Sequence, residues 1–268
     1  MIYAIIAIII LVVLYLLALN GRRGHKELRK LRGWAYAHRG LHGAGVPENS
    51  MLAFRKALDD GYGIEFDVHL MKDGTLAVIH DSSLKRTAGV VVLIEDLTLE
   101  DLDQYRLEGT DEKIPLFSEL LELYNGKAPL IIELKAHGNH AELTDAVCKA
   151  MESYKGVYCM ESFDPRVVQW LRKNRPEIIR GQLAENFLKA KDNPLNVVLK
   201  FIMTNHLMNF LSMPDFVAYK FDDRKTLGTK ICRKLWKLQG VTWTIRSQAD
   251  FDTAVAEGWI PIFENFTP

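Results

Sequence analysis

The sequence has few cysteines and no surplus of either charge, and each absence excludes a class of protein. Its three cysteines, Cys148, Cys159 and Cys232, are scattered and form no CxxC pair. Such a set argues against a disulfide framework and favours a reducing compartment. The 34 Lys and Arg residues balance the 34 Asp and Glu residues, so no overall basic field indicates a nucleic-acid partner. The length of 268 residues suits one large domain.

Charge is also absent from the N-terminal stretch, where Ile2 to Leu19 is almost wholly aliphatic. As a helix this stretch spans roughly 27 Å, close to the ~30 Å hydrocarbon core of a bilayer. A cleaved signal peptide is the alternative, but no Lys or Arg precedes the stretch and no A-x-A site follows it. The sequence therefore predicts one N-terminal transmembrane helix, an anchor over residues 1–20.

A basic stalk over residues 21–33 follows the anchor. It holds Arg22, Arg23, Lys26, Arg29, Lys30 and Arg32. Positive charge beside one end of a membrane span places that end in the cytoplasm. We therefore expect a single-pass protein of the cell membrane whose third part, a domain over residues 34–268, is cytoplasmic. The stalk is also suited to contact anionic headgroups.

Short apolar runs alternate with helical patterns through the rest of the chain. The runs lie near residues 35, 65, 131, 158, 180, 217, 242 and 261. Alternating strands and helices predict parallel βα units, and eight of them in one domain predict an α/β TIM (β/α)8 barrel. The sequence ends at Pro268, and segment 24–33 is a candidate to cover the place where an eighth helix would lie.

Glu65 and Asp67 alternate with apolar residues in the second run. Residues two apart in a strand share a face, so both carboxylates point the same way. Two carboxylates on one face repel each other, and both stay ionised only beside a cation. Ligands that are all oxygen suit a hard divalent ion, so the pair predicts Mg2+ or Ca2+ binding.

Other polar residues stand at the predicted strand ends, which in a barrel is where catalytic residues lie. They are His38, Arg39, Glu133, Lys135, Ser162, Phe163, Lys220, Trp243 and Glu264, with His80 after a further short apolar run and Glu48 as a polar neighbour. Structural alternatives exist: a backbone-bonded His38, a surface ion pair of Glu133 with Lys135, and core packing of Trp243. Five other histidines are expected to be surface or structural residues, and they are His42, His69, His137, His140 and His206.

An ordered series of motifs resembles the glycerophosphodiester phosphodiesterase family. The motifs are HRG at 38–40, PENS at 47–50, IEFDVHLMKDG at 64–74, VIHD at 78–81, LKRTAG at 84–89, IIELK at 131–135, ESFDP at 161–165 and VTWTI at 241–245. The resemblance implies a TIM barrel that hydrolyses glycerophosphodiesters with a divalent metal. It also implies the site roles: His38 and His80 in acid–base catalysis, Arg39, Lys135 and Trp243 in substrate binding, and Glu65, Asp67 and Glu133 as metal ligands.

The expected reaction releases an alcohol and sn-glycerol 3-phosphate from a small-molecule or lipid phosphodiester. Hydrolysis of lysophospholipids in the manner of a lysophospholipase D is a variant, and a non-catalytic anchored binding protein on the same fold is the alternative from another class. An amidohydrolase would carry H-x-H after the first strand, which this chain lacks. Two positions depart from the family pattern: Arg246 stands where a small polar residue such as Asn is common, and Glu264 begins a segment that usually reads Thr-Asp-x-Pro.

Residues 195–213 carry more apolar side chains than one buried helix face needs, with Lys200 as the only formal charge. The helical stripe accounts for Val197, Val198, Phe201, Met208 and Leu211, and several others lie outside it. Burial under long loops is one interpretation, and contact with the bilayer is another.

Overall fold

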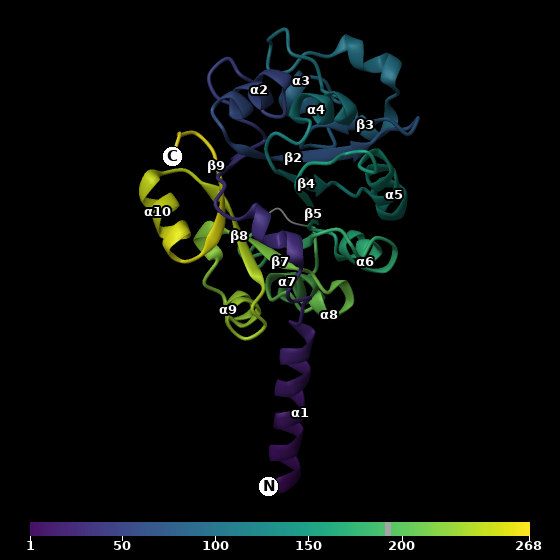
Figure 1. The fold of residues 1–268 in the computed structure, drawn as a ribbon. Coiled ribbons are helices and arrows are strands. Elements are labelled where there is room, and N and C mark those ends of the chain that lie inside the picture. The colour runs from purple at the N-terminus through teal and green to yellow at the C-terminus, as the bar shows by residue number, and fades with distance from the viewer. Residues whose placement is uncertain (191–193) are drawn as a thin grey trace.

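A closed barrel of parallel strands forms the body of the protein in the computed structural model, which describes residues 1–190 and 194–268 (Figure 1). The barrel strands are β1 (Tyr36–His38), β2 (Gly63–Leu70), β4 (Leu130–Leu134), β5 (Tyr158–Ser162), β6 (Arg180–Ala184), β7 (Phe216–Lys220), β8 (Gln239–Ile245) and β9 (Trp259–Phe263). Each strand pairs in parallel with its neighbours, and β1 closes the barrel by pairing with both β2 and β9. The predicted eight-stranded barrel is confirmed.

Helices surround the barrel as its outer layer (Figure 1). They are α2 (Met51–Asp59), α4 (Phe117–Tyr124), α5 (His140–Ala150), α6 (Pro165–Asn174), α7 (Val197–Thr204), α8 (Asn209–Ser212), α9 (Leu227–Lys234) and α10 (Gln248–Ala256), with the 3-10 turn η4 (Phe221–Asp223). Several begin at a side-chain cap: Ser50 accepts from Ala53 N, and Asp164 accepts from Arg166 N just before Pro165. These caps satisfy backbone donors that a helix start leaves unpaired.

The connection after β2 is a long excursion with a small core of its own. Strand β3 (Leu76–Val78) turns back antiparallel along the end of β2. Three short helical turns follow, and they are α3 (Lys85–Ala88), η2 (Ile94–Asp96) and η3 (Leu99–Gln104). Buried Ile79, Leu84 and Ile94 pack together inside this excursion. That packing fixes the residues just after β3, including His80.

Alternation along the strands separates two apolar layers. Ile64, Phe66 and Val68 of β2 face the outer helices, where they join the largest core cluster. Tyr36, Ile131 and Phe216 belong to a second cluster inside the barrel. Because residues two apart share a strand face, the polar side chains of β2 also point inward.

Segment 24–33 closes the N-terminal end of the barrel. Its 3-10 helix η1 (Lys26–Leu31) places Leu28 and Leu31 in the inner cluster, and the Tyr36 hydroxyl donates to Leu31 O at 2.9 Å. The expectation that this segment covers the place of an eighth helix is therefore wrong in position, because Leu28 and Leu31 join the cluster inside the barrel, whereas an eighth helix would pack on the outside of the strands. Phe251 of α10 and Phe266 pack on Phe263 after β9 instead.

Helix α1 (Ile2–Ala18) projects from the body beside α8 and α9 (Figure 1). None of its residues is buried, and only its end is held: Leu19 packs on Val217 and Cys232, and the Trp236 indole donates to Leu16 O at 2.9 Å. Within residues 1–190 and 194–268, no helix combines the length and apolar character needed to cross a membrane. The predicted transmembrane helix is therefore not supported by the structure, in which the N-terminal helix α1 has 17 residues.

Candidate active site

The carboxyl ends of the strands surround a cavity of about 340 Å³. Its walls are formed by His38, Arg39, Glu65, His80, Glu133, Glu161, Phe163, Leu183, Glu185, Trp243 and Ile262. Strand register explains the gathering, because His38 lies beside Glu65 and Asp67 lies beside Glu133. Six of the eight site residues predicted from the sequence line this cavity, and Asp67 and Lys135 contact it through their ion pairs with Arg39 and Glu133.

Three buried carboxylates form the acidic part of the site. Glu65, Asp67 and Glu133 each place an oxygen within 4.8 Å of the others. Burial, together with the neighbouring carboxylates, raises the pKa of Glu65 well above its usual range, and burial also raises the pKa of Glu133. Burial opposes ionisation of Asp67 as well, but Lys135, His80 and Arg39 hold its pKa well below the ordinary value.

These three carboxylates fit a divalent cation. A positive charge between the buried carboxylates would relieve their mutual repulsion. A donor set made only of oxygen suits Mg2+ or Ca2+ rather than a softer metal. Glu65, Asp67 and Glu133 are only 3%, 1% and 6% exposed, so water does little to screen them. The rigid β2 and β4 backbones hold the set in place.

Glu161 is a site residue that the sequence reasoning missed. It follows Glu133 in the strand register, is 1% exposed, and its Oε2 atom has no hydrogen-bond partner in the described part of the chain. Burial and the charge of Glu133 raise its pKa well above the ordinary range. The feature that could have indicated Glu161 is its inward position on β5. The next residue, Ser162, is the one that the sequence predicts at this strand end. Ser162 donates to Leu134 O at 2.7 Å and has a structural role.

Two cations balance part of this negative charge. Lys135 Nζ lies 3.0 Å from Asp67 Oδ1 and 2.6 Å from Glu133 Oε1. Arg39 donates to Glu48 at 2.8 Å and lies 3.5 Å from Asp67, so Glu48 is a polar neighbour as expected. The predicted surface alternative for Glu133 and Lys135 is wrong, because the Glu133 side chain is only 7% exposed and the Lys135 side chain only 15%.

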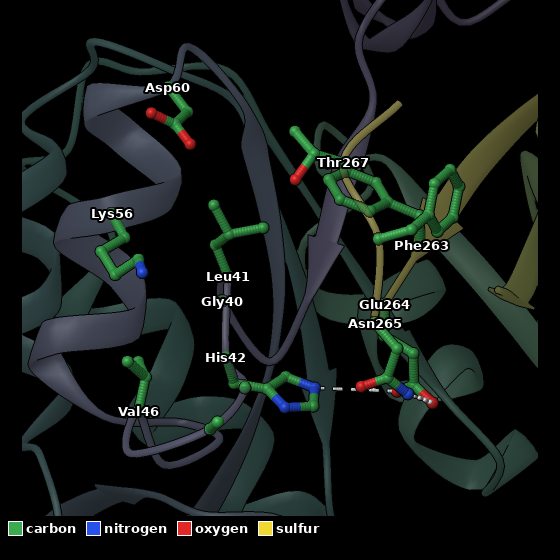
Figure 2. A pocket seen from close by; sticks show the side chains of 13 residues that line it. Gly40, Leu41, His42, Val46, Lys56, Asp60, Phe263, Glu264, Asn265 and Thr267 are labelled. Carbon is green, nitrogen blue, oxygen red and sulfur yellow. Dashed lines mark hydrogen bonds and ion pairs between the residues drawn. The ribbon is translucent and has the colours of Figure 1, made fainter. Parts of the chain in front are cut away.

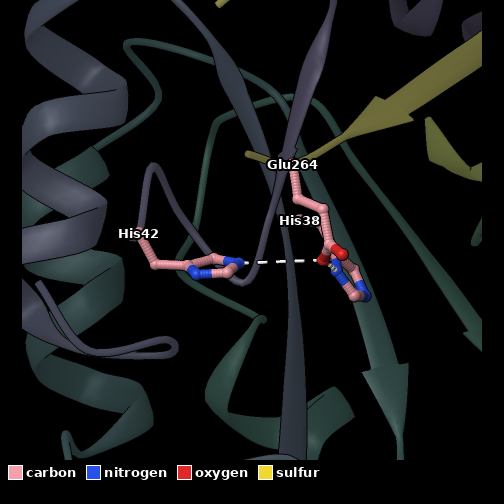
Figure 3. Close-up of side chains that lie close together, drawn as sticks. All are labelled: His38, His42 and Glu264. Carbon is pink, nitrogen blue, oxygen red and sulfur yellow. Dashed lines mark hydrogen bonds and ion pairs between the residues drawn. The ribbon is translucent and has the colours of Figure 1, made fainter. Parts of the chain in front are cut away.

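Each of the two predicted acid–base histidines has a carboxylate on its Nδ1 atom. His38 Nδ1 lies 2.5 Å from Glu264 Oε2 (Figure 3), and His80 Nδ1 lies 2.6 Å from Asp81 Oδ1. A carboxylate that accepts from Nδ1–H leaves Nε2 to accept a proton. Burial lowers the pKa of His38 despite its bond with Glu264, which favours the neutral imidazole that a general base requires.

His69 supports this pair from outside the cavity. Its Nδ1 lies 2.7 Å from Glu95 and its Nε2 lies 3.1 Å from the carbonyl oxygen of His80. The side chain is 3% exposed, which agrees with the structural role expected for it. His69 thereby fixes the backbone from which His80 projects.

An aromatic wall completes the cavity. Trp243 and Phe163 meet edge to face with centroids 5.8 Å apart, and Phe163 meets Phe187 at 6.0 Å. The Trp243 indole N–H is buried without a hydrogen-bond partner among the described residues. Trp243 therefore belongs to the wall of the cavity, with a buried N–H of a kind that is normally hydrogen-bonded.

The model of the Glycerophosphoryl diester phosphodiesterase family matches residues 38–267. The chain belongs to this family. It is 35% identical over 234 residues to the glycerophosphodiester phosphodiesterase of Caldanaerobacter subterraneus, covering 83% of this chain and 89% of that protein. It is also 35% identical over 132 residues to the lysophospholipase D of Rattus norvegicus, covering 44% of this chain and 41% of the rat protein.

A solved phosphodiesterase structure has a similar fold. The Oleispira antarctica phosphodiesterase, in complex with the product sn-glycerol-3-phosphate, superposes with a TM-score of 0.71 at 20% identity. The superposition covers 88% of this chain and 94% of that one. The likeness shows that the family barrel is shared by the two proteins.

The two departures from the glycerophosphodiester phosphodiesterase pattern meet in the structure. Arg246 Nε donates to Glu264 Oε1 at 2.7 Å, while the other oxygen of Glu264 faces His38. His42, expected to be a surface or structural residue, is partly buried with Nε2 3.7 Å from Glu264 (Figure 3). Burial raises the pKa of Glu264, but its histidine and arginine partners outweigh burial and hold the pKa far below the ordinary value.

Glu264 also borders a second cavity of about 490 Å³. Figure 2 shows Lys56 and Asp60 on the α2 side of this cavity, with Phe263 and Thr267 opposite. Glu264 thus stands in the wall between this outer cavity and the imidazole of His38. His38 contacts one oxygen of its carboxylate, and Arg246 donates to the other.

Proposed function

We propose that the protein is a metal-dependent phosphodiesterase that hydrolyses glycerophosphodiesters to an alcohol and sn-glycerol 3-phosphate. The observation that carries the proposal is the convergence of His38, His80 and three buried carboxylates on one cavity. Membership of the family supports the same reaction. A binding protein without activity would have no need of two histidines that each have a carboxylate on Nδ1.

Glu65, Asp67 and Glu133 would hold the divalent ion, which when bound supplies positive charge to the non-bridging phosphate oxygens. Arg39 and Lys135 lie beside these carboxylates and are suited to stabilise the charge that develops on phosphorus oxygens. The aromatic wall at Trp243 and Phe163 bounds the other side of the cavity. Its position suits an apolar part of the substrate.

The two histidines divide the proton transfers. One Nε2 atom accepts a proton from the nucleophile, either water or the glycerol 2-hydroxyl, as its oxygen bonds to phosphorus. The other imidazole donates a proton to the leaving alkoxide as the second phosphorus–oxygen bond breaks. With the glycerol hydroxyl as nucleophile, the product is a cyclic phosphodiester that water then opens.

The test is hydrolysis by the full chain of a panel of glycerophosphodiesters, with EDTA followed by addition of Mg2+ or Ca2+. We expect release of sn-glycerol 3-phosphate that EDTA abolishes and one of the ions restores. A His38→Ala, His80→Ala double variant is the matched control for contaminating activity. Absence of hydrolysis across the panel, with metal present and the fold intact, would refute the proposal.

Lysophospholipid hydrolysis is a second candidate, favoured by the similarity to the rat lysophospholipase D. The same panel separates the two when it includes lysophosphatidylcholine and lysophosphatidylethanolamine. A lysophospholipase D releases the headgroup alcohol and leaves a lysophosphatidic acid. Comparison of kcat/KM between lysophospholipids and their deacylated counterparts decides which substrate the site prefers.

We also propose that α1 holds the enzyme at a lipid surface. Support comes from its almost wholly aliphatic composition, the absence of any buried residue in it, and the arginines that follow. The cytoplasmic position of the domain stays a prediction. Protease accessibility of the domain in intact spheroplasts of an expressing bacterium would test it, with lysed cells as the control.

A further inference from the structure

Helix α7 has an apolar face that nothing in the described chain covers. Val197, Val198 and Phe201 are 70%, 63% and 50% exposed. The opposite side of α7 already contributes to the core, because Met203 packs on Phe187 and Tyr219. An outer barrel helix needs only one apolar side, so the exposed side is surplus to folding.

Further exposed apolar side chains lie along the side of the protein from which α1 projects. Phe210 of α8 is 48% exposed, and α8 packs against α1. Leu227 and Leu235, at the two ends of α9, are 64% and 51% exposed. Figure 1 shows α7, α8 and α9 around the place where α1 leaves the body. We call this side, defined by Val197, Val198, Phe201, Phe210, Leu227 and Leu235, the α7–α9 surface.

Charge on and beside the α7–α9 surface is mostly basic. Exposed Lys230 and Lys234 lie on α9, which carries no carboxylate, and exposed Lys237 follows it. Asp215, an acidic residue of this region, is buried in an ion pair with Arg22. Arg23 stacks on Trp236 with its guanidinium carbon 5.5 Å from the ring centroid, which adds an aromatic–basic pair of the kind that lies at membrane interfaces.

We propose that the α7–α9 surface docks on a lipid bilayer that carries anionic headgroups. Exposed aliphatic and aromatic side chains would enter the headgroup boundary while the lysines beside them contact lipid phosphates. Continuity with α1 favours a bilayer over a protein partner, since both apolar features face the same side of the molecule.

The surface also connects with the cavity, and this step rests on the proposed function. Phe187, which packs against α7 through Met203, contacts Phe163 of the cavity wall. Docking through α7 would therefore bring the aromatic wall close to the headgroup region. The substrate class that this arrangement suits is a phosphodiester still attached to an acyl chain.

Site-directed spin labelling of the full chain tests the docking. The native thiols Cys148, Cys159 and Cys232 are all buried, so a label reports the introduced position. Val197→Cys is the probe, and Val91→Cys is the matched control, because Val91 is 82% exposed in the distant excursion after β2. With phosphatidylcholine vesicles containing phosphatidylglycerol, we expect the label at 197 to lose accessibility to a polar nickel relaxer and gain accessibility to oxygen, while the label at 91 stays unchanged.

A charge variant tests the headgroup contact. Combined Lys230→Gln, Lys234→Gln and Lys237→Gln substitutions should weaken binding to the anionic vesicles by at least roughly tenfold, because each lysine near the surface contributes to attraction. The control carries Lys113→Gln, Lys149→Gln and Lys155→Gln, which change the net charge equally at exposed positions elsewhere. Binding to neutral vesicles should change little in either variant.

Several outcomes would overturn the proposal. They are equal behaviour of the labels at 197 and 91 on vesicles, equal weakening by both charge variants, or protection of label 197 without vesicles at raised protein concentration, which would indicate a second copy on this surface. Hydrolysis of a soluble glycerophosphodiester is measured for every variant and should stay at the wild-type rate. If the wild type itself has no activity, the proposed function fails while the label still decides the docking.

Discussion

At the scale of single residues, the charge of Asp67 depends on its neighbours. Lys135 lies 3.0 Å from one oxygen and Asn49 donates to the other at 2.9 Å, with Arg39 at 3.5 Å. Glu65 has fewer such partners, and burial with nearby carboxylates raises its pKa. The neighbours of Asp67 thus favour its ionised form, whereas ionisation of Glu65 needs a further cation nearby.

Replacement of either carboxylate should remove the metal. Glu65→Gln and Asp67→Asn are each expected to abolish metal binding and activity together, because each removes a buried anionic ligand. Isothermal titration with Mg2+ and Ca2+ measures the binding, and Glu142→Gln, at an exposed position of α5, is the control. Full activity of the wild type after exhaustive dialysis against EDTA would contradict this prediction.

The two acid–base histidines should act as a unit. His38→Ala and His80→Ala are each expected to lower kcat by about 10²–10⁴-fold, the usual share of general acid–base catalysis. The double variant should be little worse than either single variant, and metal binding should survive in all three. Stopped assays with a soluble glycerophosphodiester measure kcat. Turnover close to wild type in either single variant would show that the roles are wrongly assigned.

Glu264 should act as a positioning residue through His38. Glu264→Gln keeps the size of the side chain but removes the charge that orients the imidazole, so kcat should fall about tenfold or more with little change in KM. Arg246→Gln leaves the His38 contact in place and should have a smaller effect on kcat. A loss that appears equally in KM would indicate that Glu264 binds substrate instead.

The sequence predicted those site residues whose position follows from a strand. Glu65 and Asp67 share a face by simple alternation, and His38 stands at a strand end. Glu161 and the contact of His42 with Glu264 depend on register between strands and on loop paths. Local alternation on β5 does place Glu161 inward, but these contacts with Glu133 and Glu264 are not encoded in local spacing.

At the scale of elements, η1 has a role that its composition does not indicate. Its residues are mostly charged, so the sequence predicts a basic stalk segment there. Leu28 and Leu31, three residues apart, nevertheless share a side of the short helix and enter the barrel. The spacing was present in the sequence, but its partner, the open N-terminal end of a barrel, exists only after folding.

Loss of this contact should destabilise the barrel without changing its chemistry. Leu31 is 1% exposed, so Leu31→Ala is expected to lower the free energy of unfolding by about 2–5 kcal/mol. The neighbouring surface substitution Lys30→Ala should change it little. Urea denaturation followed by far-UV circular dichroism measures both, and kcat at low temperature should stay near wild type. An unchanged unfolding midpoint for Leu31→Ala would show that η1 does not close the barrel.

Helices α7 and α8 are separated at a boundary that the apolar periodicity of the sequence does not predict. The apolar pattern of residues 195–213 indicates helical structure but marks no boundary within it. The structure ends α7 at Thr204, whose carbonyl accepts from the Tyr219 hydroxyl at 3.1 Å. His206 then adopts a positive φ of 57° and is buried beside Thr229. A tertiary contact with β7 and α9 therefore sets this helix boundary.

At the scale of the whole molecule, ligand binding and stability are linked. A metal that binds only the folded barrel stabilises it by an amount set by concentration and affinity. At about 100 times its dissociation constant, Mg2+ or Ca2+ should stabilise the wild type by about 2.7 kcal/mol. Calorimetry should show a raised Tm that Glu65→Gln abolishes. An equal rise in both proteins would place the stabilising ion elsewhere.

The junction between α1 and the barrel is closely packed. Gly21 lies where an added Cβ would meet Pro214 O at 2.5 Å, and Arg22 then forms an ion pair with buried Asp215. Under the proposed attachment of α1 to a lipid surface, such a junction would also set the direction in which the barrel mouth faces. Flexible residues inserted after Leu19 would then leave the chain attached but remove this fixed orientation. The distance of the barrel from the lipid surface and its orientation toward that surface, which a flexible linker would keep separate, would then be a single property of the fold.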